Sequence, residues 1–202
     1  CDRVDVYRGE EKDYLRVVDY KTGSRNFSLD RIYNGLSMQM LIYMYVLIRQ
    51  QFAKKDNPVL PGGVVYQHSD ADAYFDKSET EAKLYTADGM ALAEEEICRA
   101  FDKNEKGEYG VIKNDKGKIK KLPGSEAVSR EKFGAVLEYV KDAVQKMGDG
   151  IYGGTFDDIP LAEKREDTGI ACKYCNYKSV CLNTNKKKVM EKRQFDREEK
   201  DG

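Results

Sequence analysis

Asp19 and Lys21 are the two residues whose types and spacing best suit chemistry. They close the run Val17-Val18-Asp19-Tyr20-Lys21, which predicts a β-strand leading into the turn residues Thr22 and Gly23. Because side chains at positions i and i+2 of a strand lie on one face, the carboxylate and the ammonium would stand side by side. Carboxylate oxygens bind Mg²⁺ or Mn²⁺, and a lysine ammonium is a point charge suited to a phosphate. The alternative is a strand that runs into a polar turn without a chemical role.

A predicted hairpin adds a second carboxylate to this pair. Residues 2–7 and 14–19 have the pattern of two strands, and the six residues between them are rich in turn formers. If these six residues close the hairpin, Asp2 falls opposite Asp19, where two like charges repel each other. A divalent cation between them removes that conflict. Two carboxylates, such a cation and Lys21 are a set of groups that can hydrolyse a phosphodiester.

Gln39 and Tyr43 form a second candidate pair. They are four residues apart and so share one face of the helix predicted over residues 28–52. In the alternative interpretation Tyr43 belongs to the core, and Gln39 is a partly buried polar residue with local hydrogen bonds.

The remaining pattern predicts an α/β protein. The helix over 28–52 has Ser28 or Asp30 as a cap and a break at Gly35, and it is apolar enough to be buried on nearly all sides. Val64-Val65-Tyr66 predicts a core strand, so the order is strand–strand–helix–strand. Later elements are separated by polar loops. They are a loop over 70–82, with His68 also in a polar loop, a helix over 88–101, two short strands around 114–117, a helix capped by Ser129 and ending near Gly148, and a charged tail over 186–202 that is a frayed helix or disordered.

Composition sets wide limits on function. The chain has 202 residues, enough for one or two domains with a sizeable core. Its 35 basic and 36 acidic side chains nearly cancel, so any basic surface must be local. Neither a membrane-spanning run nor a signal peptide is predicted. Because the chain begins at Cys1 within an expected strand, we expect it to be a piece of a longer polypeptide.

Three of the five cysteines form the motif Cys172-x₂-Cys175-x₅-Cys181. An odd number of cysteines with three clustered suits a metal site in a reducing compartment better than a disulfide framework. This spacing fits zinc and an iron–sulfur cluster about equally, and free buried thiols are a third alternative. We expect Cys1 to be a core residue and Cys98 to be buried in a helix.

A basic segment is a fourth candidate. Its lysines could follow a DNA backbone, in which case binding would weaken steeply with salt. The alternative is a solvated hairpin in which the lysines alternate with acids such as Asp115. The residues are Lys113, Lys116, Lys118, Lys120 and Lys121.

Three stretches together resemble the RecB-like nucleases of the PD-(D/E)XK superfamily. They are Cys1-Asp2-Arg3-Val4-Asp5, Val18-Asp19-Tyr20-Lys21-Thr22-Gly23 and Gln39-Met40-Leu41-Ile42-Tyr43. The resemblance implies a restriction-endonuclease-like α/β core with a mixed sheet flanked by helices and a C-terminal cysteine-cluster segment. It also implies a nuclease site that uses Mg²⁺ or Mn²⁺, with Asp2 and Asp19 as the metal ligands. The implied catalytic residues are Asp2, Asp19, Lys21, Gln39 and Tyr43.

Within this family the chain resembles the AddB-type nuclease domains of bacterial helicase–nucleases in three further stretches. They are Tyr33-Asn34-Gly35-Leu36-Ser37, Gly62-Gly63-Val64-Val65-Tyr66 and Cys175-x-Tyr177-Lys178-Ser179-Val180-Cys181. This likeness implies a nuclease domain over 1–185, divided into a catalytic core (1–68), an insert with a hairpin (69–128) and a helix with the cysteine segment (129–185). It implies a 4Fe–4S cluster held by Cys172, Cys175, Cys181 and a fourth cysteine upstream.

The same likeness implies an exonuclease on single-stranded DNA that processes double-strand breaks for homologous recombination and degrades the 5′-ended strand. The implied partners are DNA ends and an AddA-like helicase subunit, in the bacterial cytoplasm. Two alternatives remain: a stand-alone or CRISPR-associated RecB-like Fe–S exonuclease, and a non-catalytic, metal-stapled module that binds DNA or a protein.

Overall fold

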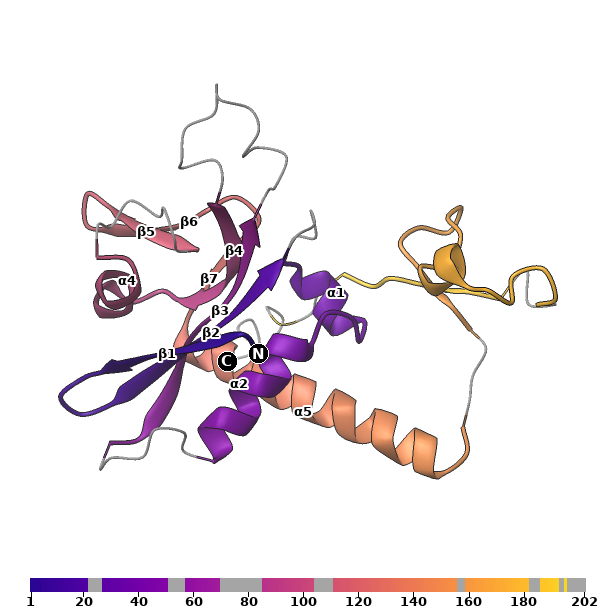
Figure 1. Cartoon of the computed structure of the whole chain (residues 1–202), viewed down its shortest axis with the longest axis horizontal. Coiled ribbons are helices and arrows are strands. Elements are labelled where there is room, and N and C mark those ends of the chain that lie inside the picture. The colour runs from indigo at the N-terminus through magenta and orange to yellow at the C-terminus, as the bar shows by residue number, and fades with distance from the viewer. Residues whose placement is uncertain are drawn as a thin grey trace, which may run out of the picture. The chain divides into compact units, whose positions relative to one another are not determined.

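A mixed five-stranded sheet is the main element of the structure, a computed structural model (Figure 1). The structure describes residues 1–21, 27–50, 57–69, 85–103, 111–155, 159–181, 186–192 and 195. The predicted loop over 70–82 and the turn residues Thr22 and Gly23 therefore lie outside the described residues. The chain divides into two units, one of Cys1–Ser28 and Ser37–Lys141 and the other of Leu29–Leu36 and Asp142–Gly202. Each is described by itself.

The sheet confirms the predicted α/β class with mixed strand directions. Its strands lie in the order β1-β2-β3-β4-β7; the β1–β2 and β3–β4 pairs are antiparallel, and the β2–β3 and β4–β7 pairs are parallel. The bounds are β1 (Arg3–Arg8), β2 (Asp13–Lys21), β3 (Val59–Ser69), β4 (Tyr85–Leu92) and β7 (Glu126–Val128).

The hairpin of β1 and β2 has the predicted register. Tyr7 faces Tyr14, with ring centroids 6.4 Å apart, and the pairing runs to Arg3 opposite Val18. This pairing ends one residue before Asp2 and Asp19. Cys1 is exposed, so the expectation that it belongs to the core is wrong; it precedes β1 and has no strand position to bury it.

The two faces of the sheet carry different layers. Tyr14 and Val18 of β2 pack on the face covered by α4 (Glu95–Phe101) and by β5 (Ile112–Asp115). By alternation Leu15 and Val17 lie on the opposite face; both are fully buried. Helix α2 (Gln39–Arg49) packs against β2 and β3, on the side away from α4 (Figure 1). Asp19 and Lys21 share the α2 face with Val17.

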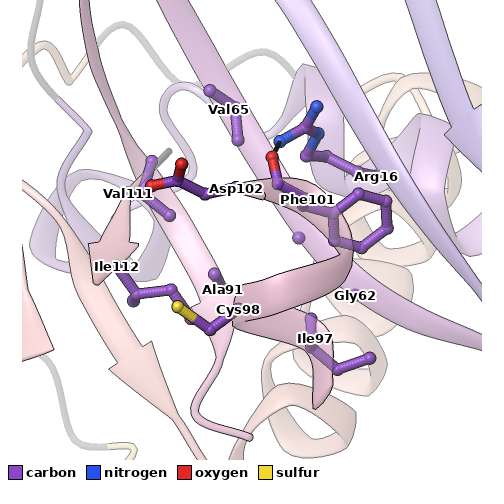
Figure 2. A pocket seen from close by; sticks show the side chains of 11 residues that line it. Arg16, Gly62, Val65, Ala91, Ile97, Cys98, Phe101, Asp102, Val111 and Ile112 are labelled. Atoms are coloured by element: carbon purple, nitrogen blue, oxygen red, sulfur yellow. Dashed lines mark hydrogen bonds between the residues drawn. The ribbon is translucent and has the colours of Figure 1, made fainter. Parts of the chain in front are cut away.

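On the α4 face, a partly buried arginine links the sheet to α4. Figure 2 shows Arg16 donating a hydrogen bond of 2.9 Å to the carbonyl oxygen of Phe101, beside a void of about 20 Å³ between α4 and the sheet. Arg16 also pairs with Asp5 at 2.6 Å. Burial would raise the pKa of Asp5, but hydrogen bonds from Arg3 and Arg16 outweigh it and hold this pKa below its usual range. Cys98 is buried on this face, as predicted.

The helical segment is divided as predicted. Helix α1 (Leu29–Tyr33) ends before Gly35, whose φ of +80° is a conformation that favours glycine, and α2 begins at Gln39. Helix α2 buries one stripe of Met40, Leu41 and Met44, while Val46 is exposed. The expectation of burial on nearly all sides is therefore wrong, because the sheet covers only one side of this helix.

Two predictions between residues 64 and 101 are wrong. His68 lies in β3 rather than in a polar loop. Residues 85–92 form β4, and helix α4 begins only at Glu95, whereas a helix was predicted from Asp88. Pairing with β3 outweighs the helix propensity of this segment, and Gly89 permits it because a Cβ there would collide with the carbonyl oxygen of Val64.

The hairpin predicted around 114–117 is present. Strands β5 and β6 (Lys118–Lys121) pair around Lys116 and Gly117, which have positive φ angles of 54° and 77°. Ser129 caps α5 (Arg130–Tyr152), since its Oγ accepts a hydrogen bond from the Lys132 N–H. This helix continues past Gly148, so the predicted end is wrong.

Besides α1 and the end of α5, the regular elements in the described residues of the second unit are short. Strands β8 (Leu161–Ala162) and β9 (Lys188–Val189) pair in parallel, and the 3₁₀ helix η1 (Ala171–Tyr174) lies between them in the chain. A strand therefore stands where the sequence predicted a frayed helix or disorder. No helix in the described part of the chain is long and apolar enough to cross a membrane.

Candidate active site

Asp19 and Lys21 lie together at the end of β2. Asp19 is 6% exposed, and the Lys21 Nζ is 2.5 Å from its Oδ2. This contact lacks the angles of a hydrogen bond, and no described group hydrogen-bonds to the buried Oδ2. A buried carboxylate oxygen without a hydrogen bond is unfavourable by itself and is a suitable ligand for a hard divalent cation. The residue therefore fits the expected metal.

Asp2, which directly precedes β1, is hydrogen-bonded to the same end of β2. It is exposed, and its Oδ2 accepts a hydrogen bond of 2.8 Å from the backbone N–H of Tyr20. By strand alternation Asp2 is on the Asp19 face, whereas Asp5 faces Arg16 on the α4 side. The register thus separates the two acids of the Asp2-Arg3-Val4-Asp5 stretch: Asp5 has a structural ion pair, and Asp2 is the one available to the site.

Gln39 and Tyr43 form a second pair in the first turns of α2. The Gln39 Nε2 donates a hydrogen bond of 2.9 Å to the Tyr43 hydroxyl. Gln39 is exposed and Tyr43 is half-buried, so Tyr43 is not a core residue. The structure thus brings the predicted residues together as two pairs, Asp19 with Lys21 on β2 and Gln39 with Tyr43 on the helix that packs against it.

The sequence did not point to Tyr66, His68 and Asp88, which extend the polar region across β3 and β4. Tyr66 pairs with Asp19 on one side and with Asp88 on the other, and His68 pairs with Lys21. The Lys21 Nζ lies 5.6 Å from the centroid of the Tyr66 ring. The alternation of Val64, Tyr66 and His68 could have indicated this face, but Asp88 gave no signal because its segment was predicted as a helix.

The three cysteines of the C-terminal motif line one pocket of about 290 Å³. Cys172 is half-buried at η1, and Cys175 and Cys181 are exposed. Lys178, Lys186 and Lys187 also line this pocket. Across the described ranges, no three His, Cys, Asp or Glu side chains come close enough together to hold a single metal ion.

The lysines proposed to contact DNA lie on the β5–β6 hairpin, on the α4 side of the sheet. Lys120 pairs with Asp115 at 2.6 Å and Lys121 with Glu126 at 3.4 Å, whereas Lys116 and Lys118 are exposed. The hairpin is thus on the face opposite Asp19, and contact with DNA there stays a prediction.

Comparison with known proteins gives the class of the chain. The family model of the PD-(D/E)XK nuclease superfamily matches residues 1–182. The chain therefore belongs to this superfamily, as the resemblance implied.

The chain is also similar to the AddB-type subunits of ATP-dependent helicase/deoxyribonucleases. It is 34% identical over 188 residues to that of Clostridium novyi (strain NT), an alignment that covers 89% of this chain and 16% of the relative. It is 30% identical over 213 residues to that of Clostridium perfringens (strain 13 / Type A), with 95% and 18% covered. For Thermoanaerobacter sp. (strain X514) the identity is 31% over 192 residues, with 89% and 16% covered. The chain thus spans less than a fifth of the length of these relatives.

Proposed function

We propose that this chain is the nuclease domain of an AddB-type helicase–nuclease subunit and hydrolyses phosphodiester bonds in single-stranded DNA. The observation that carries the proposal is the buried Asp19 Oδ2, which lacks a hydrogen bond and lies beside the Lys21 ammonium at a strand end. Membership of the PD-(D/E)XK superfamily supports the same assignment.

Each site residue has a role in this proposal. Asp2 and Asp19 would hold Mg²⁺ or Mn²⁺, which when bound neutralises phosphate charge and makes a water molecule nucleophilic near neutral pH. Lys21 holds the attacking water or offsets charge on the phosphate oxygens. Gln39 and Tyr43, joined by their hydrogen bond, shape the wall of the site and contact the DNA strand.

The biological setting of the proposal comes from the relatives, which are named as helicase/deoxyribonuclease subunits. We infer that the domain acts on DNA ends exposed by a motor in the same complex, with an AddA-like helicase subunit as partner. It would degrade the 5′-ended strand during processing of double-strand breaks for recombination, in the bacterial cytoplasm.

Removal of divalent metal is expected to abolish cleavage. The full-length complex should degrade single-stranded DNA in Mg²⁺ or Mn²⁺ and stop when EDTA is in excess. Labels placed separately on the 5′ and 3′ ends of a duplex, with ATP present, report which strand is degraded. Cleavage that persists in EDTA would contradict the proposed chemistry, and a complex that binds DNA without cutting it in either metal would indicate a non-catalytic module.

We further propose that Cys172, Cys175 and Cys181 hold a 4Fe–4S cluster with a fourth cysteine from upstream of this chain. In such a cluster each thiolate binds a different iron atom, so three cysteines around one pocket suit it without converging on a single ion. Three lysines and two acidic residues, Glu166 and Asp167, line the same pocket, and the excess of positive charge suits a cluster that is anionic with four thiolates.

Full-length protein purified without air is expected to contain about four iron atoms per chain and to absorb light broadly at about 400 nm. Cys175→Ser should lose most of the iron and the absorption. Cys1→Ser is the matched control, because Cys1 is an exposed cysteine outside the motif and should leave both signals unchanged. Stoichiometric zinc without this absorption would overturn the iron–sulfur assignment.

A further inference from the structure

Polar side chains continue from the proposed nuclease site across two neighbouring strands. In the register of β2, β3 and β4, Asp19, Tyr66 and Asp88 form one row, and Lys21 and His68 begin the next row. Laterally paired residues of a sheet lie on the same face, so all five belong to the Asp19 face. Tyr66 lies between the two aspartates in this row, and the Lys21 Nζ lies over its ring.

Asp88 is a buried carboxylate with both oxygens in use. It is 5% exposed; its Oδ1 contacts the His68 Nε2, and its Oδ2 accepts a hydrogen bond from the backbone N–H of Phe27. The His68 side chain is 14% exposed, so the pair is largely shielded from water. A buried carboxylate is tolerated when hydrogen bonds compensate it, and the His68 imidazole and the Phe27 N–H are the two partners that do so here.

The two partners of Asp88 belong to two different segments, both of which follow β2 in the chain. His68 is the lateral neighbour of Lys21 on β3. Phe27 is buried and belongs to the segment that leads from β2 toward the helix carrying Gln39 and Tyr43. One carboxylate therefore ties the strand beside Lys21 to the chain that connects the two halves of the site.

We propose that His68 and Asp88 are positioning residues of the nuclease site, which keep the Lys21 ammonium against Asp19. This inference rests on the proposed nuclease function. His68 compensates the Asp88 carboxylate through their contact and thereby leaves Asp19 as the carboxylate that attracts Lys21. Without this contact, the uncompensated Asp88 carboxylate on the same face attracts the Lys21 ammonium away from Asp19, over the Tyr66 ring.

The first test compares His68→Leu with His68→Gln in the full-length complex. Leucine keeps much of the bulk but cannot donate a hydrogen bond, whereas the glutamine amide can donate to Asp88 from near the position of Nε2. His68→Leu is expected to lower kcat on single-stranded DNA by about 10–100-fold, the usual effect of losing an outer-shell partner, with KM within about threefold. His68→Gln should restore kcat to within about threefold of the wild type.

The second test is the double variant His68→Leu with Asp88→Asn. Asparagine keeps an acceptor for the Phe27 N–H but removes the negative charge. If the uncompensated charge of Asp88 displaces Lys21, removing that charge restores most of the kcat lost in His68→Leu. A merely structural role predicts that the double variant is at least as impaired as the single one. Where His68→Leu does not fold, the folded double variant is compared with the wild type directly, and a kcat within about tenfold is expected.

Asp13→Asn is the matched control. Asp13 is a buried carboxylate paired with Arg8 at 2.9 Å, at the opposite end of β2 from Asp19. Its loss is expected to reduce stability without changing the kcat of the folded enzyme.

The wild type and Asp19→Asn, assayed alongside, distinguish a failure of the positioning role from a failure of the proposed nuclease function. An active wild type, an inactive Asp19→Asn and an unimpaired His68→Leu would overturn the positioning role alone. A His68→Gln as impaired as His68→Leu, or a folded double variant that is inactive, would also overturn it. A wild type without nuclease activity would overturn the proposed function and the positioning role together.

Discussion

Asp19→Asn is expected to lower the rate of DNA hydrolysis by about 10³-fold or more, the scale expected when a main charge-stabilising group is lost. The Asp19 Oδ2 is buried, lies 2.5 Å from the Lys21 ammonium and lacks a hydrogen bond. The substitution removes the negative charge that would bind a divalent cation, and it leaves Lys21 without its anionic partner. Since asparagine has nearly the same shape, the fold around β2 should persist.

The measurement is the initial rate of single-stranded DNA cleavage by the full-length complex, together with DNA affinity. DNA affinity should change little, because Gln39 and Tyr43, the residues proposed to contact the DNA, remain in place. Asp5→Asn is the matched control: Asp5 belongs to the same stretch as Asp2 but pairs with Arg16 on the opposite face, so catalysis by the folded enzyme should persist. Unchanged degradation of both strands by Asp19→Asn would contradict the assignment of this residue.

The half of the site on the first hairpin could be predicted from sequence because its geometry is local. Six turn residues fix the register of β1 against β2, and strand alternation then assigns each side chain to a face. This is why the Asp19–Lys21 pair and the choice between Asp2 and Asp5 follow from residue numbers. The spacing of Gln39 and Tyr43 likewise predicts their shared helix face, where the structure shows a hydrogen bond.

The contact between His68 and Asp88 could not be predicted from the sequence because it depends on pairing between distant segments. His68 and Asp88 are twenty residues apart, and they meet because β3 and β4 are antiparallel neighbours. The segment from Asp88 is rich in Ala, Leu and Glu, residues that favour helices, and this propensity suggested a helix where tertiary pairing forms a strand. Only the register of β4 places a second buried carboxylate on the proposed catalytic face.

Gly89→Ala is expected to destabilise the sheet by about 3 kcal/mol, at the upper end of the usual cost of overpacking. A Cβ on Gly89 would collide with the carbonyl oxygen of Val64 and would lie 3.0 Å from the Cα of Val65. Both neighbours are backbone atoms of the central strand β3, so they cannot move aside as a flexible side chain would. Because Gly89 follows Asp88 directly, a shift of β4 would also disturb the contact between Asp88 and His68.

Hydrogen exchange measured by mass spectrometry on the full-length protein can detect this effect locally. A loss of about 3 kcal/mol should speed exchange of the β3 and β4 amides by about 10²-fold where exchange follows local opening. Gly134→Ala is the matched control: Gly134 lies inside α5, and a Cβ there would meet no atom within 4 Å. In that helix alanine should instead slow exchange slightly, because it stabilises a helix interior by about 0.5–1 kcal/mol relative to glycine. Equal exchange of β3 and β4 in Gly89→Ala and the wild type would mean that the sheet accepts a side chain at this position, and the close approach of β3 and β4 would not be what requires glycine there.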